Sequence, residues 1–186
     1  MDAFSRLPRE DVTRHPGPGR TLARVAATGV PRGVGPHWVD MRWLCQTVAD
    51  GLADRARKQR VKIDVTLCAS PAAVIGYADR LYRAVRRLGR NALDVMPNGG
   101  TLTLRVDRIP YVLIEVCDTG PGIPPERLAK LWDTDDRMRQ GGGLPATRVT
   151  IEAHHGYIWY RPQPGGGSCF QIELPAAGPR TESLAS

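Results

Sequence analysis

The sequence predicts a two-layer α/β sandwich, in which a mixed β-sheet carries its helices on one face. The first observation is that stretches with apolar residues at helical spacing alternate with short stretches of strand character. The second is that two pairs of strands follow each other directly, one turned near Pro110 and the other joined by a Gly-rich turn. Elements in this order bury their apolar sides in one two-layer core.

The individual elements follow from local patterns. A first helix is predicted at residues 41–59, with Asp40 well placed as its N-cap, and Leu44, Val48 and Leu52 recur on its core side. The last long helix, at 144–155, is expected to end at Gly156. The other elements are strands at 61–67 and 72–77, a helix at 78–96, strands at 101–109 and 111–118, a short helix at 124–132, a loop at 133–143, and closing strands at 156–162 and 168–175.

These elements define one predicted domain, residues 36–175, between two less structured ends. Residues 1–35 are rich in Gly, Pro and Arg and predict a flexible basic arm, and residues 176–186 predict a disordered tail. No apolar run approaches the about 20 residues of a membrane-spanning helix, and the N-terminus has no segment of signal-peptide type. We therefore expect a cytoplasmic protein with no membrane partner.

The chain carries a net charge of +7, mostly from arginine. The basic residues form no block interleaved with aromatic residues, which disfavours nucleic acid as a partner. An arginine cluster in the helix at 78–96 leaves two interpretations open, a solvated face or a face for an anionic ligand or acidic protein. Its members are Arg80, Arg83, Arg86, Arg87 and Arg90.

The four cysteines predict neither a metal site nor catalysis. Their spacing matches no short metal-ligand pair and no dense disulfide framework. Three of them lie in apolar surroundings that are typical of reduced, buried cysteines. They are Cys45, Cys68, Cys117 and Cys169.

Four segments, taken together, carry the functional prediction. The common phosphate loops are excluded first, because no lysine follows a Gly-rich turn and GPGIPP does not open the helix of a βαβ unit. The four segments are RNALDVMPNGG at 90–100, DTGPGI at 118–123, GGGL at 141–144 and GGGSCFQIELP at 165–175.

The chemistry of these residues indicates an adenine nucleotide. Asp118 ends a predicted strand, where its carboxylate can accept the amino hydrogen of adenine and repel the carbonyl oxygen of guanine. Gly120 and Gly122 let the backbone lie flat against a base, because no Cβ intervenes. Gly141 and Gly143 precede a helix, whose N–H groups and positive dipole end favour phosphate. The prediction is a site that selects ATP over GTP.

In order and spacing, the segments resemble the Bergerat-type ATP-binding family of gyrase, Hsp90, MutL and histidine kinases. They are most similar to the catalytic, ATP-binding domain of bacterial sensor histidine kinases, of which NALDVMPNGGTLTL and IEAHHG are typical. The resemblance implies ATP and Mg²⁺ as cofactors, with the amide oxygen of Asn91 as a magnesium ligand. It also places Ser168 near adenine, Ile123 and Leu144 among the ATP-binding residues, and Trp132 either at the base of the ATP lid or in the core.

The implied function is a protein-histidine kinase of a two-component phosphorelay. Such a domain donates the γ-phosphate of ATP to a histidine on a domain not in this chain, and a response regulator is a further expected partner. An acceptor histidine needs a long two-helix hairpin. His15, His37 and the adjacent His154 and His155 fit no such hairpin, and the last two are interpreted as structural.

The sequence departs from its relatives at several positions of the site. Four residues before Asn91, relatives carry Asn, His or Glu, whereas this chain has Arg87, which stays protonated and cannot act as a general base. Asp94 replaces a phosphate-binding lysine of many kinases, Pro145 replaces a small or apolar residue of the Gly-rich segment, and the lid is short. Proline is tolerated in a first helical turn, so the helix start is expected to survive.

Two consequences follow from the departures. Arg87, Arg90, Arg137 and Arg139 are candidates to supply the positive charge that Asp94 does not. The departures also leave an alternative function open, that of a degenerate, non-catalytic regulator or adaptor of anti-sigma or phosphorelay-scaffold type that acts by protein binding.

Overall fold

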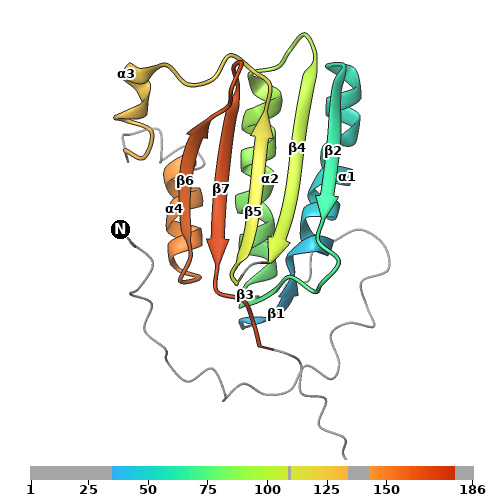
Figure 1. Ribbon diagram of the computed structural model, residues 1–186, viewed down its shortest axis with the longest axis vertical. Coiled ribbons are helices and arrows are strands. Elements are labelled where there is room, and N and C mark those ends of the chain that lie inside the picture. Colours follow the sequence, from blue (N-terminus) through green and yellow to red (C-terminus); the bar gives the residue numbers. More distant parts are fainter. Residues whose placement is uncertain (1–34, 109, 134–142, 179–186) are drawn as a thin grey trace, which may run out of the picture.

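The computed structural model describes residues 35–108, 110–133 and 143–178 and shows a sheet with a layer of helices behind it (Figure 1). The strands of the mixed sheet lie in the order β2 (Val61–Leu67), β4 (Gly100–Arg108), β5 (Val112–Asp118), β7 (Ser168–Leu174) and β6 (Tyr157–Pro162). The helices are α1 (Met41–Lys58), α2 (Ala78–Asp94), α3 (Pro125–Leu128) and α4 (Leu144–Glu152). Because α1, α2 and α4 cover the same face of the sheet, the predicted fold class is confirmed.

The sheet is mixed because it contains one parallel pair. β2 runs parallel to β4, with Val61 opposite Gly100, and α2 lies in the connection between them. The pairs β4–β5, β5–β7 and β6–β7 are antiparallel. Burial alternates along β5 from Val112 to Asp118, so one side of the strand packs on the helices and the other lies on the open face.

The first helix begins where the sequence predicts. The carboxylate of Asp40 accepts a hydrogen bond from the backbone N–H of Arg42 at 3.0 Å and also pairs with the Arg42 guanidinium at 2.7 Å. The predicted core side of α1 is buried, with Leu44 and Val48 fully excluded from solvent. None of the helices in the described ranges combines the length and apolarity needed to cross a membrane.

A small second sheet pairs β3 with a strand that lies before α1, and this first strand was not predicted. β1 (His37–Asp40) pairs antiparallel with β3 (Ala73–Gly76), and Trp38 lies opposite Ile75. The sequence predicts only β3, because the four residues of β1 are too few to show an alternating pattern. β1 forms because β3 offers it a partner from a distant part of the chain.

The start of β3 is also hydrogen-bonded to the far end of the described chain. The backbone N–H of Ala177 donates to the carbonyl oxygen of Ala73 at 2.7 Å, and the N–H of Met41 donates to Ala72 at 2.8 Å. Ala177 is buried, although the sequence analysis assigns it to the tail. The entry and the exit of the described domain therefore meet at one short strand.

Gly156 follows α4 as predicted, but it is not the left-handed residue that ends the helix. The left-handed residue after this helix is His155, with φ 58°, not Gly156. The N–H of Gly156 donates to Ile151 at 3.0 Å, and a Cβ at position 156 would lie 2.4 Å from the carbonyl oxygen of Glu173. Glycine is therefore required here by the close approach of β7 rather than by backbone conformation.

The cysteines differ from the expectation that they are reduced. Cys117 of β5 and Cys169 of β7 lie opposite each other and form a disulfide across 52 residues of sequence. Cys45 and Cys68 are free, and Cys45 is buried as expected. Spacing could not predict the disulfide, because the pairing of two distant strands creates it.

Candidate functional site

Asp118 lies at the end of β5 with 5% of its surface exposed. Its Oδ1 accepts hydrogen bonds from the backbone N–H groups of Gly120, at 2.8 Å, and Ser168, at 3.3 Å. Within the described part of the chain, both backbone bonds go to Oδ1, which leaves Oδ2 to accept from a ligand. Burial raises the pKa of this carboxyl group, and the two N–H groups oppose that rise by stabilising the charged form.

The Gly-rich turn before β7 packs directly on the loop that follows Asp118. A Cβ on Gly167, whose φ is 101°, would lie 2.1 Å from the carbonyl oxygen of Asp118. A Cβ on Gly122 would lie 3.3 Å from the carbonyl oxygen of Gly167. Two predicted segments thus meet here, and Gly167 belongs to the site although the sequence analysis does not single it out. The run of three glycines was the available signal.

Apolar and small polar residues flank this loop on the side of α2. A Cβ on Gly120 would lie 2.9 Å from Cγ2 of Val95, and Val95 is exposed although it is hydrophobic. Met96 is buried beneath it, and the Thr119 hydroxyl lies 3.7 Å from the Met96 sulfur. Val95, Met96 and Thr119 were not predicted as site residues. Their position places an apolar surface beside the carboxylate.

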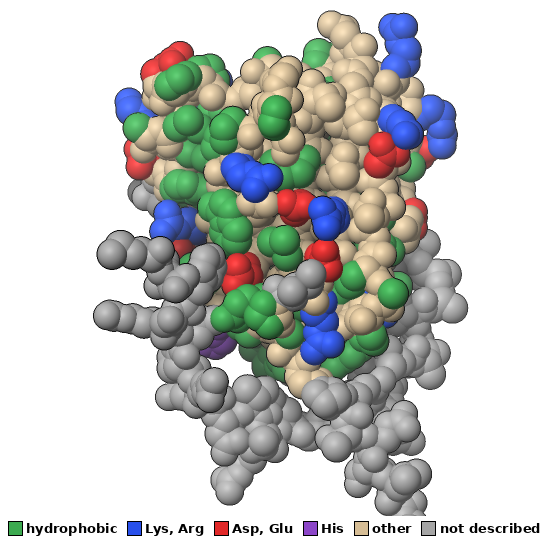
Figure 2. Space-filling view, viewed as in Figure 1, with side chains coloured by type: hydrophobic (Ala, Val, Ile, Leu, Met, Phe, Trp, Pro, Cys, Tyr) green, Lys and Arg blue, Asp and Glu red, His purple; other side chains and the backbone are tan. Residues whose placement is uncertain are grey.

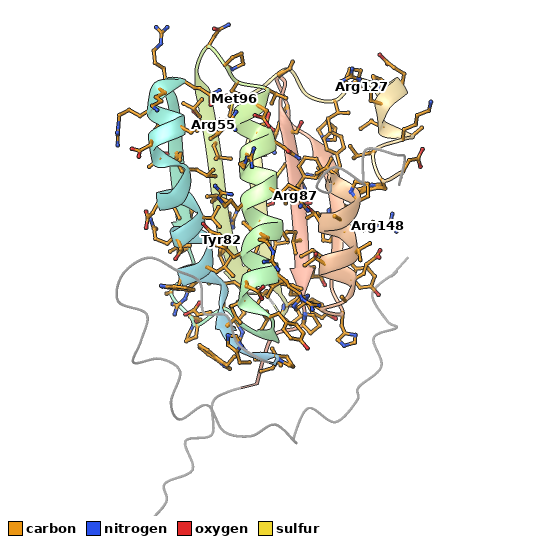
Figure 3. The ribbon with its side chains drawn as sticks, turned by 180° about the vertical axis from the view of Figure 1, so that it is seen from behind. Arg55, Tyr82, Arg87, Met96, Arg127 and Arg148 are labelled. Carbon is orange, nitrogen blue, oxygen red and sulfur yellow. A yellow bond between two sulfur atoms is a disulfide. The ribbon has the colours of Figure 1, made fainter. Side chains whose placement is uncertain are left out.

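Asn91 and Arg87 lie one turn apart on α2 and so share a flank of the helix. Both side chains are half-buried, whereas Arg90 is exposed. The pKa of Arg87 is lowered first by burial and then by repulsion from Arg83 and Arg90. Figure 3 shows Arg87 midway along α2 on the helix side of the molecule. Among the predicted candidates for positive charge on α2, Arg87 is the one on the flank of Asn91.

Asp94, which replaces the lysine of relatives, forms an ion pair with Arg55 of α1. Both side chains are partly exposed, so the pair contributes little to stability. Figure 3 shows Arg55 on α1 near the end of α2 that Met96 follows. The acidic charge three residues after Asn91 is therefore partly neutralised within the fold.

The start of α4 is kept despite the departure at Pro145. Gly143 is the N-cap of α4, Leu144 is its first residue and Pro145 lies in the first turn. The N–H that proline lacks would have had no partner within the helix at this position. The expectation that the helix start survives is confirmed. Gly141, Arg137 and Arg139 lie outside the described residues.

Aromatic residues form the end of the core next to the lid. The ring of Trp132 meets Phe170 edge-on at 6.3 Å between centroids, and the guanidinium of Arg148 lies 5.8 Å from the Trp132 ring. Ile123 is half-buried and packs against the core. Trp132 therefore packs on the core, which is one of its two predicted roles, and the residues of the predicted lid from 134 to 142 lie outside the described part of the chain.

Comparisons with known proteins find a matching family model and relatives that cover most of this chain. Residues 76–178 match the family model described as histidine kinase-, DNA gyrase B-, and HSP90-like ATPase. The chain is 36% identical over 148 residues to the adaptive-response sensory kinase SasA of Thermosynechococcus vestitus, covering 74% of this chain and 38% of that protein. It is 28% identical over 160 residues to the sensor histidine kinase TmoS of Ectopseudomonas mendocina, covering 79% and 16%. The chain thus spans well under half the length of these relatives.

Solved structures share the fold. The catalytic domain of histidine kinase ThkA superposes with a TM-score of 0.70 at 21% identity, covering 78% of this chain and 100% of that one. The mycobacterial sensor histidine kinase MprB superposes with a TM-score of 0.63 at 27% identity, covering 76% and 97%.

Proposed function

This chain belongs to the histidine kinase-, DNA gyrase B-, and HSP90-like ATPase family, and from that premise we propose that it is the ATP-binding catalytic domain of a sensor histidine kinase. Asp118 binds adenine, Asn91 holds Mg²⁺, and Gly141 and Gly143 bind phosphate at the start of α4. The γ-phosphate passes to a histidine of a separate acceptor domain, and from there to a response regulator. The relatives carry kinase names, which does not favour the alternative of a non-catalytic regulator.

The orientation of the Asp118 carboxylate carries this proposal. Two backbone N–H groups hold Oδ1, so the carboxylate is fixed without the help of a ligand and presents Oδ2. An oxygen held in this way discriminates by hydrogen bonding, since guanine would place an acceptor against it. Gly167 and Gly122 keep the backbone beside it free of side chains, as a flat base requires.

The residues present fit a bound Mg·ATP. Asn91 offers one amide oxygen, and Mg²⁺ is usually bound by one or two protein oxygens together with phosphates and waters. The described residues contain no cluster of three or more acidic, histidine or cysteine side chains that could hold a metal by themselves. When bound, the ion neutralises charge on the phosphates.

The residues of this chain act by positioning rather than by covalent chemistry. Arg87 keeps its charge at any physiological pH, because a guanidinium with a lowered pKa is still a strong base. It therefore serves as a cation for the phosphates and cannot deprotonate water, which favours phosphoryl transfer over hydrolysis. Trp132 and Phe170 exclude water from the end of the core beside the site.

Calorimetric titration with ATP and MgCl₂ tests the proposal. The wild-type protein is expected to bind ATP and to bind GTP at least about 100-fold more weakly, as expected when a buried acceptor meets a mismatched base. Asp118→Asn should abolish the preference for ATP. Asp64→Asn, on the distant edge strand β2, is the matched control and should bind like wild type. Absence of wild-type binding would overturn the proposal.

A second measurement establishes catalysis. The protein is incubated with γ-labelled ATP and a separately purified acceptor hairpin from a histidine kinase relative. Label on the acceptor histidine, lost with Asn91→Ala, supports the kinase function. ATP binding without any transfer to the acceptor would favour the regulator instead.

A further inference from the structure

We propose that Cys117 and Cys169 are a redox-active pair that regulates nucleotide affinity, a regulation that rests on the function proposed above. The disulfide joins the residue before Asp118 to the residue after Ser168. The N–H of Ser168 donates to Oδ1 of Asp118. One covalent bond and one hydrogen bond thus connect the same two strand ends, and the hydrogen bond orients the carboxylate that reads adenine.

The disulfide occupies the last pair of the β5–β7 ladder. Pairing begins with Val112 opposite Leu174 and ends with Cys117 opposite Cys169. Beyond that pair the strands are connected through the Asp118 carboxylate and the close contact of Gly167 with the Asp118 carbonyl oxygen. A covalent bond at this point limits how far the two ends can separate. When it is cleaved, the ladder can fray where the base is bound.

The two sulfurs lie on the open side of the sheet, opposite the nucleotide. Val116 and Asp118 face the helices, so Cys117 between them faces the other way. The next pair on that face is Glu115 and Gln171, which are hydrogen-bonded to each other. Figure 2 shows this face, with charged and hydrophobic side chains interleaved over the strands. Cys169 is fully buried and Cys117 is half-buried, so a reductant reaches the pair at Cys117, from the face away from the nucleotide.

The chemistry is thiol–disulfide exchange. A reductant thiolate attacks Sγ of the half-buried Cys117, which breaks the bond to Cys169 and forms a mixed disulfide. A second thiol of the reductant then attacks the mixed disulfide and releases Cys117. The net reaction transfers two electrons and two protons, so that one protein disulfide and one dithiol become two cysteine thiols and the oxidised reductant.

The other cysteines do not compete for this reaction. Cys45 is buried, and burial raises the pKa of its thiol to about 12, which leaves almost no thiolate. Cys68 is half-buried, and its thiol donates to the carbonyl oxygen of Ser70 at 3.3 Å. Within the described residues, reduction therefore acts at the disulfide between Cys117 and Cys169. Cys68 is a free thiol in both states, so its labelling can serve as an internal standard.

The test compares oxidised and dithiothreitol-reduced wild-type protein in calorimetric titrations with ATP and MgCl₂. The oxidised form is expected to bind about fivefold more tightly, the lower end of usual coupling between linked sites. Because ATP binding and disulfide formation are thermodynamically linked, each must favour the other by the same factor. Saturating ATP should therefore shift the dithiol–disulfide equilibrium toward the disulfide by about fivefold. Alkylation and mass spectrometry measure that equilibrium, with Cys68 labelled in both states.

Variants separate the pair from other effects of reductant. Cys117→Ser combined with Cys169→Ala should bind ATP like the reduced protein in either buffer, and Cys68→Ser should keep the wild-type response. Equal ATP affinity of oxidised and reduced wild-type protein would overturn the regulation while leaving the proposed function intact. Failure of both forms to bind ATP would instead overturn the proposed function. If the double variant folds poorly, the comparison of oxidised with reduced wild-type protein still tests the regulation.

Discussion

The backbone N–H of Tyr77 donates a hydrogen bond to Nε2 of His154 at 3.0 Å, across 77 residues of sequence. Tyr77 is the N-cap of α2, and His154 follows the last turn of α4. Nδ1 of His154 lies 2.7 Å from the carbonyl oxygen of Thr150, which assigns the proton of a neutral imidazole to Nδ1. A Cβ on Gly76 would lie 2.4 Å from this ring. His154 therefore links the start of α2 to the end of α4, as predicted for a histidine with a structural role.

Replacing His154 should destabilise the fold. His154→Phe keeps a ring of similar size but leaves the N–H of Tyr77 without its acceptor, which costs about 1–3 kcal/mol. Urea unfolding followed by circular dichroism measures the change. His155→Asn is the control, because His155 is exposed and asparagine tolerates its left-handed backbone. Equal stability of wild type and His154→Phe would contradict this assignment.

The same histidine should make stability depend on pH. Burial is the largest influence and lowers the pKa of His154; Arg80 and His155 also lower it, while the bond to Thr150 and the charge of Asp79 oppose this. Because the folded pKa lies below the unfolded value of 6.5, stabilisation is complete above that pH and is lost as the pH falls toward the folded pKa. Urea unfolding at about pH 7.5 and about pH 5, on either side of the ordinary value of 6.5, should show this decline, and His154→Phe should weaken it.

Gly167→Ala should damage both stability and nucleotide binding. Its Cβ would lie 2.1 Å from the carbonyl oxygen of Asp118, so the turn and the Asp118 loop must move apart. Gly165→Ala is the matched control, because Gly165 has φ 85° but open space around its Cβ position. We expect Gly165→Ala to cost about 1 kcal/mol of stability from backbone strain and to leave ATP affinity unchanged. For Gly167→Ala we expect a larger loss and at least about tenfold weaker ATP binding. Similar affinities of the two variants would argue against a site at this turn.

Arg87→Gln should weaken binding of ATP but not of adenosine. The arginine lies on the flank of α2 that carries Asn91, so under the proposed function its charge would act on the phosphates and not on the base. A loss of about 1 kcal/mol corresponds to about a fivefold weaker affinity for ATP. Arg83→Gln is the comparison, since Arg83 is exposed and pairs with Asp79 at 2.8 Å. Equal weakening of ATP and adenosine by Arg87→Gln would indicate a disturbed helix rather than a lost phosphate contact.

Features that depend on neighbouring residues could be predicted from the sequence. The Asp40 cap of α1 needs a carboxylate next to the first turn, and the position of Asp118 needs an acid at the end of an apolar strand. Both requirements are visible within a few residues of sequence. The predicted helices and most strands were found for the same reason.

Features that depend on distant residues could not be predicted. β1 exists because β3 pairs with it, the disulfide exists because Cys117 and Cys169 fall in register, and Asp94 is paired by a residue of another helix. In the site itself, the carboxylate was predictable but its N–H donor at Ser168 and the contact with Gly167 were not. Those partners come together only when β5 and β7 are aligned.

The contacts of β3 with both ends of the domain have a consequence for its connections. The described chain enters through β1 and leaves at Ala177, and both meet β3 at one end of the molecule. The end of β5 that carries Asp118 points to the opposite end (Figure 1). Sequences attached at either end of the described domain would therefore join it at this small two-stranded sheet, far from the loop that follows Asp118.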